Sequence, residues 1–116
     1  MTSSNAIGVD IVEIERCIKK LERNPALYLD ICAPGEKAPT SPAAFARRWA
    51  LKEAVTKAAG FYIPPSSILI EHTKEGAPKT RILDEELSHL YFEVSVSDDA
   101  GLAVAVATCS SIKERA

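Results

Sequence analysis

The sequence has few aromatic side chains, few cysteines and no long hydrophobic run. Aromatic residues make up 6% of the 116 residues, so the core must be built mainly from Ala, Val, Ile and Leu. The three cysteines, Cys17, Cys32 and Cys109, are odd in number and lack C-x-x-C spacing, which argues against both a disulfide framework and a zinc site. The longest apolar runs are far shorter than the roughly 18 residues that cross a bilayer, so no membrane span is expected.

The chain also lacks an excess of charge of either sign. Its 14 Lys and Arg and 16 Asp and Glu give a formal net charge of -2. This balance is typical of a globular domain and argues against a protein that coats nucleic acid. The amino terminus shows no basic flank followed by a long apolar stretch, so no secretory signal is expected. We therefore expect a cytoplasmic protein with neither nucleic acid nor membrane as a partner.

A length of 116 residues suits one compact domain, which we expect to span residues 1–116. A domain of this size buries about 60–65% of the surface that its unfolded chain exposes, so its stability is marginal. Burial between copies of the chain would add to that stability. Length thus favours an oligomer.

Apolar periodicity and turn residues predict an α+β order of elements. Ser41 and Pro42 provide a helix start and Gly60 a helix stop, so a long helix is expected over 42–59. The remaining pattern predicts a strand over 6–12, a helix from 13 to Asn24-Pro25, a helical piece over 26–32, strands over 68–72 and 79–83, a brief helix over 84–90, and a hairpin of 91–97 and 102–107 around a turn at 98–101.

Asp10 interrupts an otherwise apolar strand, where an unpaired carboxylate would be strongly penalised. One interpretation is structural: Asp10 caps a helix that begins near Val12, or pairs with an arginine. The other is functional, with the carboxylate binding a metal or transferring protons. The residues alone leave both interpretations open.

Within the expected long helix, every fourth residue from Phe45 through Trp49 and Glu53 to Lys57 shares one face. This row begins aromatic and is expected to end in an ion pair. A surface ion pair is one interpretation, worth a few tenths of a kcal/mol. The aromatic start instead indicates that the face is covered.

Arg48 and Lys52 form the neighbouring row of the same helix. Together with Lys57 they could bind the oxygens of a polyphosphate, while the carboxylates of Asp10 and Glu53 hold Mg²⁺. The sequence spacing is compatible with this site without requiring it.

Four cations occupy one face of the first expected helix: Arg16, Lys19, Lys20 and Arg23. A solvated face is the simpler interpretation. On a chain of net charge -2, however, this local concentration also suits docking of an acidic partner.

Two segments give the sequence a resemblance to a known family. Residues 7–16 read Ile-Gly-Val-Asp-Ile-Val-Glu-Ile-Glu-Arg, and residues 48–60 read Arg-Trp-Ala-Leu-Lys-Glu-Ala-Val-Thr-Lys-Ala-Ala-Gly. Both resemble the holo-acyl-carrier-protein synthases, the small 4′-phosphopantetheinyl transferases, and the likeness continues through Gly76-x-Pro78 and Ser95-Val96-Ser97. The resemblance implies a small antiparallel sheet packed on a long central helix, in a homotrimer with active sites between subunits.

The resemblance also implies an activity, namely transfer of the 4′-phosphopantetheine arm from coenzyme A (CoA) to a serine of apo-acyl carrier protein, with release of adenosine 3′,5′-bisphosphate. Asp10 and Glu53 match the family's Mg²⁺-binding acids, and Glu53 also matches the residue proposed to activate the serine. Lys57 matches a lysine that neutralises phosphate charge, and Arg48 a basic residue that faces the nucleotide. Arg16 matches an arginine that receives the carrier's acidic helix, so the four-cation stripe becomes the expected docking face. Further expected CoA contacts are Lys52, Gly60, Gly76, Pro78, Ser97 and Asp98.

Three positions depart from the family pattern. Asp98 stands where the family usually has His, and Ala77 stands where it usually has Lys. A Thr-x-x-Glu signature appears as 33–36, with Glu36 retained as either a metal-shell or a structural acid. These departures keep open two alternatives: a relative that binds acyl carrier protein or CoA without transfer, and a nucleotide-binding structural protein.

Overall fold

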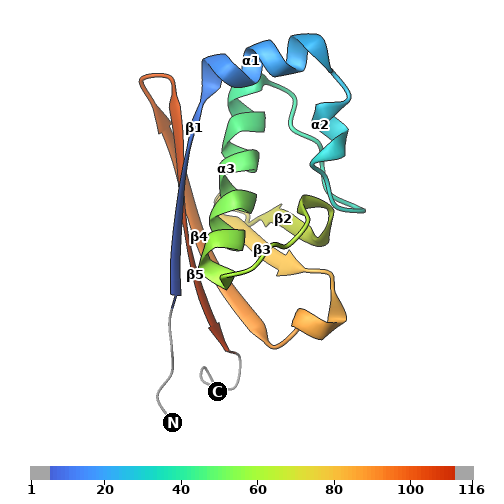
Figure 1. Ribbon diagram of the computed structural model, residues 1–116, viewed down its shortest axis with the longest axis vertical. Coiled ribbons are helices and arrows are strands. Elements are labelled where there is room, and N and C mark those ends of the chain that lie inside the picture. The colour runs from blue at the N-terminus through green and yellow to red at the C-terminus, as the bar shows by residue number, and fades with distance from the viewer. Residues whose placement is uncertain (1–5, 112–116) are drawn as a thin grey trace.

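The computed structural model describes residues 6–111, which form one long helix packed on the larger of two antiparallel sheets, with short helices at one end (Figure 1). The larger sheet has the order β1–β5–β4, and the smaller one pairs β2 with β3. The helix α3 lies across one face of the larger sheet, and α1 packs at one end of α3. The elements are β1 Ala6–Glu13, α1 Ile14–Arg23, α2 Leu27–Asp30, α3 Pro42–Ala59, β2 Ile68–His72, β3 Pro78–Ile82, β4 Leu90–Asp99 and β5 Leu102–Ser111, with 3₁₀ turns at Pro65–Ser67 and Glu85–Leu87. The predicted α+β class, with an antiparallel sheet on a long helix, is confirmed.

The boundaries of α3 follow from its capping residues. Ser41 has an extended backbone, and its Oγ accepts a hydrogen bond from the Ala44 amide at 3.1 Å. Gly60 ends the helix with a φ of 85°, a conformation that costs glycine nothing. The helix predicted over 42–59 is confirmed.

Small side chains let α3 approach the larger sheet closely. Four alanines at i+4 spacing on the helix face three alternate alanines of β5, and all seven are buried. Larger hydrophobic residues then fill the space on either side of this contact. The seven alanines are Ala46, Ala50, Ala54 and Ala58 of α3 and Ala103, Ala105 and Ala107 of β5.

Gly8 brings β1 equally close to the helix. A Cβ at this position would lie 2.5 Å from the Ala58 amide nitrogen and would also collide with the Ala54 carbonyl oxygen. Only glycine therefore allows this backbone contact between β1 and α3. The contact sets the position of Asp10, two residues further along the same strand face.

The β4–β5 hairpin is longer and tighter than predicted. Its strands extend to Asp99 and from Leu102, and the connecting residues Ala100 and Gly101 both have positive φ, 52° and 81°. A two-residue turn with both residues at positive φ matches the right-handed twist of the strands. The expectation of a four-residue turn at 98–101 is corrected, because Asp98 belongs to β4.

On β1 and β5, the face of the larger sheet away from α3 carries exposed apolar side chains, which no other element within residues 6–111 covers. Ile7, Val9 and Ile11 of β1 are 71%, 53% and 61% exposed. Val9 lies opposite Val106 of β5, which is also exposed.

Within residues 6–111, no helix is long and apolar enough to cross a membrane.

Candidate functional site

A hollow of about 270 Å³ lies where β1, α1 and α3 meet, and it contains several of the predicted site residues. Asp10 comes from β1, Arg16 from α1 and Glu53 from α3. The hollow therefore brings together segments that are far apart in the sequence. Its other lining residues are Ile11, Val12, Glu13, Cys17, Lys20, Leu27, Phe45 and Trp49.

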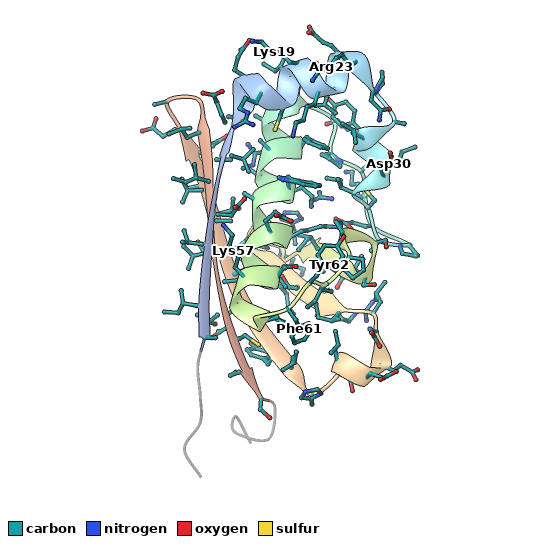
Figure 2. The ribbon with its side chains drawn as sticks, in the orientation of Figure 1. Lys19, Arg23, Asp30, Lys57, Phe61 and Tyr62 are labelled. Atoms are coloured by element: carbon teal, nitrogen blue, oxygen red, sulfur yellow. The ribbon has the colours of Figure 1, made fainter. Side chains whose placement is uncertain are left out.

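Asp10 is paired with a lysine of α3. Its Oδ1 accepts a hydrogen bond from Lys57 Nζ at 2.9 Å, and the same ammonium donates to the Val9 carbonyl oxygen at 3.1 Å. Lys57 thus reaches across to β1 (Figure 2). The expected pair between Lys57 and Glu53 is corrected: β1 lies so close to α3 that Asp10 takes the lysine instead.

Glu53 lies one helical turn before Lys57 and lines the hollow beside Asp10. Within the described part of the chain, its carboxylate makes no hydrogen bond or ion pair. The aromatic start of this row is covered, as expected. Phe45 is buried, and its ring stacks on that of Trp49 with centroids 6.3 Å apart. This face of α3 therefore begins with packed aromatic side chains and continues to Glu53, whose carboxylate has no partner within residues 6–111.

Lys52 does not belong to this hollow. Its side chain is 1% exposed, and Nζ donates to Glu36 Oε1 at 2.7 Å. Two carbonyl oxygens, those of Ile31 and Pro65, accept its other hydrogen bonds at 2.5 and 3.0 Å. An ammonium has three N–H bonds, so none is left for a phosphate. The expectation that Lys52 contacts CoA is corrected, because the loop over 31–37 covers it.

Burial lowers the pKa of Lys52, while the hydrogen bond and the negative charge of Glu36 oppose that change. Glu36 also accepts hydrogen bonds from the Ala33 amide and from Arg48. Both carboxylate oxygens are thus occupied, and the side chain is fully buried. Of the two roles open to Glu36, the structure favours the structural one.

Arg48 lines a second hollow, of about 560 Å³, whose walls come from residues 35–40 and from α3, β2 and β4. Arg47 lines it too, and its Nη1 donates to Asp98 Oδ2 at 2.8 Å. The residue that departs from the family's usual His is thus tied to α3 by an ion pair. Lys37, Thr40 and His72 add polar groups to this hollow.

The remaining predicted CoA contacts lie away from both hollows. Gly60 ends α3, and Gly76, with a φ of 91°, lies in the turn between β2 and β3. Pro78 begins β3 and lines a third hollow of about 330 Å³. Because Asp98 points toward α3, its neighbour Ser97 faces the uncovered side of the sheet. Within residues 6–111 of one chain, none of these residues lines the hollow that contains Asp10 and Glu53.

The basic stripe of α1 is exposed along its length, but its members face two directions. Arg16 and Lys20 line the hollow of about 270 Å³ that contains Asp10 and Glu53, the smaller hollow below. Lys19 and Arg23 lie outside it, at the end of the molecule that α1 forms (Figure 2). The stripe therefore begins at the candidate site and continues over the surface.

Two features of the site are not predicted from the sequence. The first is the close contact at Gly8, for which a glycine inside a β-branched run is the available signal. The Arg47–Asp98 pair spans 51 residues of sequence, and no local pattern predicts it.

A family model described as the 4′-phosphopantetheinyl transferase superfamily matches residues 6–107. The holo-[acyl-carrier-protein] synthase of Nitratiruptor sp. is 37% identical over 113 residues, which cover 87% of this chain and 95% of that protein. The same enzyme from Frankia alni is 31% identical over 117 residues, with 90% and 96% covered.

Solved structures give the same result. Helicobacter pylori holo-[acyl-carrier-protein] synthase in complex with coenzyme A superposes with a TM-score of 0.79 at 30% identity, covering 87% of this chain and 96% of that one. The Neisseria meningitidis enzyme superposes with a TM-score of 0.79 at 28% identity, with 90% and 96% covered. The match of family model, relatives and fold shows that the chain belongs to the holo-[acyl-carrier-protein] synthases of the 4′-phosphopantetheinyl transferase superfamily.

Proposed function

We propose that this protein is a Mg²⁺-dependent holo-[acyl-carrier-protein] synthase, which moves the 4′-phosphopantetheine arm of CoA to a serine of apo-acyl carrier protein. One observation carries the proposal: Asp10 and Glu53, 43 residues apart in the sequence, line the same hollow in a chain of this family. Relatives solved with coenzyme A support the choice of donor.

The two carboxylates suit Mg²⁺. This ion is commonly held by one or two carboxylates together with the phosphates of a substrate. Glu53 has no protein partner within residues 6–111, and Asp10 uses only Oδ1 for Lys57, so carboxylate oxygens remain on both. Described His, Cys, Asp and Glu side chains form no group of three or more with metal-binding geometry. When bound, Mg²⁺ would neutralise the charge that the pyrophosphate of CoA carries and develops.

The reaction needs no nucleophile from this chain. The carrier's serine oxygen attacks the phosphorus that bears pantetheine, and the bond from that phosphorus to the oxygen of the adenosine phosphate breaks. Glu53, directly or through water, takes the serine proton, and adenosine 3′,5′-bisphosphate leaves with the electron pair. Lys57 stabilises negative charge on the phosphates, so catalysis rests on positioning and electrostatics.

The larger hollow suits the nucleotide end of CoA. Arg48 and Arg47 present guanidinium groups there, and guanidinium groups bind phosphate in a fixed planar geometry. The two hollows use different residues of α3: Arg47 and Arg48 line the larger one, whereas Glu53 lines the one that holds Asp10. CoA would therefore place its adenosine phosphates in the larger hollow and its reacting phosphorus in the hollow that holds Asp10 and Glu53.

Transfer is tested by the intact mass of an apo-acyl carrier protein after incubation with CoA, Mg²⁺ and this protein. We expect the carrier to gain one phosphopantetheine, and omission of Mg²⁺ to prevent the gain. Measured CoA binding with no gain on any acyl carrier protein tested would instead show a relative that binds without transfer.

We also propose that the protein is a homotrimer in the cytoplasm. The three cysteines are free thiols in the structure, which suits a reducing compartment. The uncovered apolar face of the larger sheet offers the surface for assembly. Assembly could also bring a neighbour's Ser97, on that same face, toward a site that is incomplete within one chain.

Val106→Glu is expected to convert the trimer to monomers, because it places a charge at the centre of the apolar face, opposite Val9. Light scattering after size-exclusion chromatography measures the mass. Tyr62→Glu is the matched control, since Tyr62 is 69% exposed but lies after α3, away from that sheet face. A wild-type protein of monomeric mass would contradict the proposal.

A further inference from the structure

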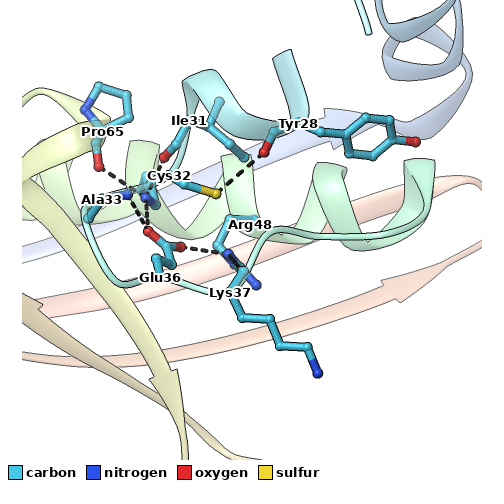
Figure 3. Close-up of polar contacts among 9 residues, drawn as sticks. Tyr28, Ile31, Cys32, Ala33, Glu36, Lys37, Arg48 and Pro65 are labelled. Carbon is cyan, nitrogen blue, oxygen red and sulfur yellow. Dashed lines mark hydrogen bonds and ion pairs between the residues drawn. The ribbon is translucent and has the colours of Figure 1, made fainter. Parts of the chain in front are cut away.

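Glu36 is a buried carboxylate shared by two cations from successive turns of α3 (Figure 3). Its Oε1 accepts hydrogen bonds from Lys52 Nζ and the Ala33 amide, both at 2.7 Å. Its Oε2 accepts from Arg48 Nη1 at 2.6 Å. Charge-assisted hydrogen bonds of this length are about twice as strong as neutral ones. Both ends of the carboxylate are therefore fixed.

Lys52 holds the surroundings of this carboxylate in place. Its ammonium binds the Ile31 carbonyl, just after α2, and the Pro65 carbonyl, at the start of a 3₁₀ turn. With Glu36, it joins two segments, the loop over 31–37 and the 3₁₀ turn that begins at Pro65, to the middle of α3. A buried cation with three partners costs much to release, so this junction is rigid.

Arg48 is the member of the cluster that reaches outward. Only Nη1 is used: it donates to Glu36 and, at 2.8 Å, to the Lys37 carbonyl oxygen. Within residues 6–111, Nε and Nη2 have no partner, while the side chain is only 11% exposed. The guanidinium is thus held at one nitrogen, with its other donors available at the larger hollow.

The charges of the cluster do not cancel. Two cations, Lys52 and Arg48, share one carboxylate, Glu36, which leaves one positive charge in excess. Since Lys52 has no free donor, that excess is available to a ligand through Arg48. A phosphate bound in the larger hollow would balance this excess positive charge.

We propose that Lys52 and Glu36 are positioning residues that hold Arg48 in the orientation in which it binds a phosphate of CoA. The inference rests on the proposed function and deepens it. Neither Lys52 nor Glu36 touches CoA; both act through Arg48. A guanidinium that is already fixed loses little side-chain entropy on binding, so the cluster increases affinity for CoA.

Glu36→Gln tests this role with little change of shape. The amide offers N–H groups toward Arg48 or Lys52, where acceptors are needed, so one of the two cations loses its partner. We expect the Kd and the KM for CoA to rise about three- to tenfold, as for the cost of ordering one freed arginine side chain on binding. We expect kcat at saturating CoA to change far less, and the KM for the carrier to stay unchanged.

A double-mutant cycle separates positioning from a general effect on folding. In an Arg48→Ala background, Glu36→Gln should change the Kd for CoA by less than about twofold, because the residue through which it acts is gone. In an Arg47→Ala background, the full effect should persist, since Arg47 lines the same hollow but pairs with Asp98. Calorimetry gives the Kd values, and circular dichroism checks the fold.

If Glu36→Gln does not fold, Lys52→Met takes its place in the same cycle, because it removes the junction while keeping similar volume. Equal losses of CoA affinity with and without Arg48 would overturn the positioning role. A wild-type protein that binds CoA and shows the coupling but transfers nothing would contradict the proposed function alone. A wild-type protein that binds no CoA would overturn both.

Discussion

Asp10→Asn and Glu53→Gln are each expected to lower the rate of phosphopantetheine transfer by about 10²-fold or more, with the fold intact. Each change keeps the shape of the side chain and removes one negative charge from the smaller hollow. Loss of one preorganised group that stabilises a developing charge typically costs about 10²–10³-fold in kcat. Glu53→Gln also removes the proposed acceptor of the serine proton, so its effect should be the larger.

Transfer is measured by carrier mass at saturating CoA, over a range of Mg²⁺ concentrations. Asp10→Asn should recover part of its activity at high Mg²⁺, because its main defect is weakened metal binding. Glu53→Gln should not recover. Glu85→Gln, in an exposed 3₁₀ turn away from the site, is the matched control and should keep the wild-type rate. Near-normal rates for both site variants would show that the metal-site assignment is wrong.

The parts of the fold that were predicted depend on local signals. The bounds of α3 follow from Ser41, Pro42 and Gly60, each of which acts within one helical turn. The alanine rows that bring α3 onto β5 were not predicted. Alanine at every fourth position carries little amphipathic signal, and its importance appears only when the facing strand also has small residues.

Partners within the site depended on long-range packing. The i+4 rule assigned Glu53 to Lys57, but Gly8 lets β1 approach so closely that Asp10 becomes the partner. The position of Lys52 beside Glu53 suggested a phosphate ligand, whereas the loop over 31–37 buries it. No residue of α3 itself indicates that this loop folds over Lys52.

The meeting of Asp10 and Glu53 in one hollow was expected only from the family resemblance. A separation of 43 residues has no preferred geometry, and Asp10 could equally have paired with an arginine elsewhere. The structure explains why these two side chains lie in the same hollow: β1 contacts α3 closely at Gly8, two residues before Asp10.

Arg16→Glu is expected to raise the KM for the acyl carrier protein by about 10–100-fold, as for reversal of a charge at a polar interface. Arg16 is exposed, yet it also lines the hollow that contains Asp10 and Glu53. An acidic helix docked along α1 would therefore meet Arg16 next to the reacting centre. Lys19→Glu should have a smaller effect, because Lys19 lies outside the hollow.

The same substitution should raise the Kd for CoA far less than the KM for the carrier, because the nucleotide end of CoA is proposed to bind in the larger hollow, which Arg16 does not line. Lys74→Glu is the matched control: it also shifts the net charge from -2 to -4, but at the exposed turn between β2 and β3. If the carrier docks on α1 itself, only Arg16→Glu should weaken binding of the carrier. The dependence of kcat/KM on salt should also be steep for the wild type and shallower for Arg16→Glu, because the variant has lost an attraction that salt screens. Equal losses of carrier binding and CoA binding would place Arg16 in the CoA site. Equal effects of Arg16→Glu and Lys74→Glu on carrier binding would show that docking depends only on the net charge of the protein.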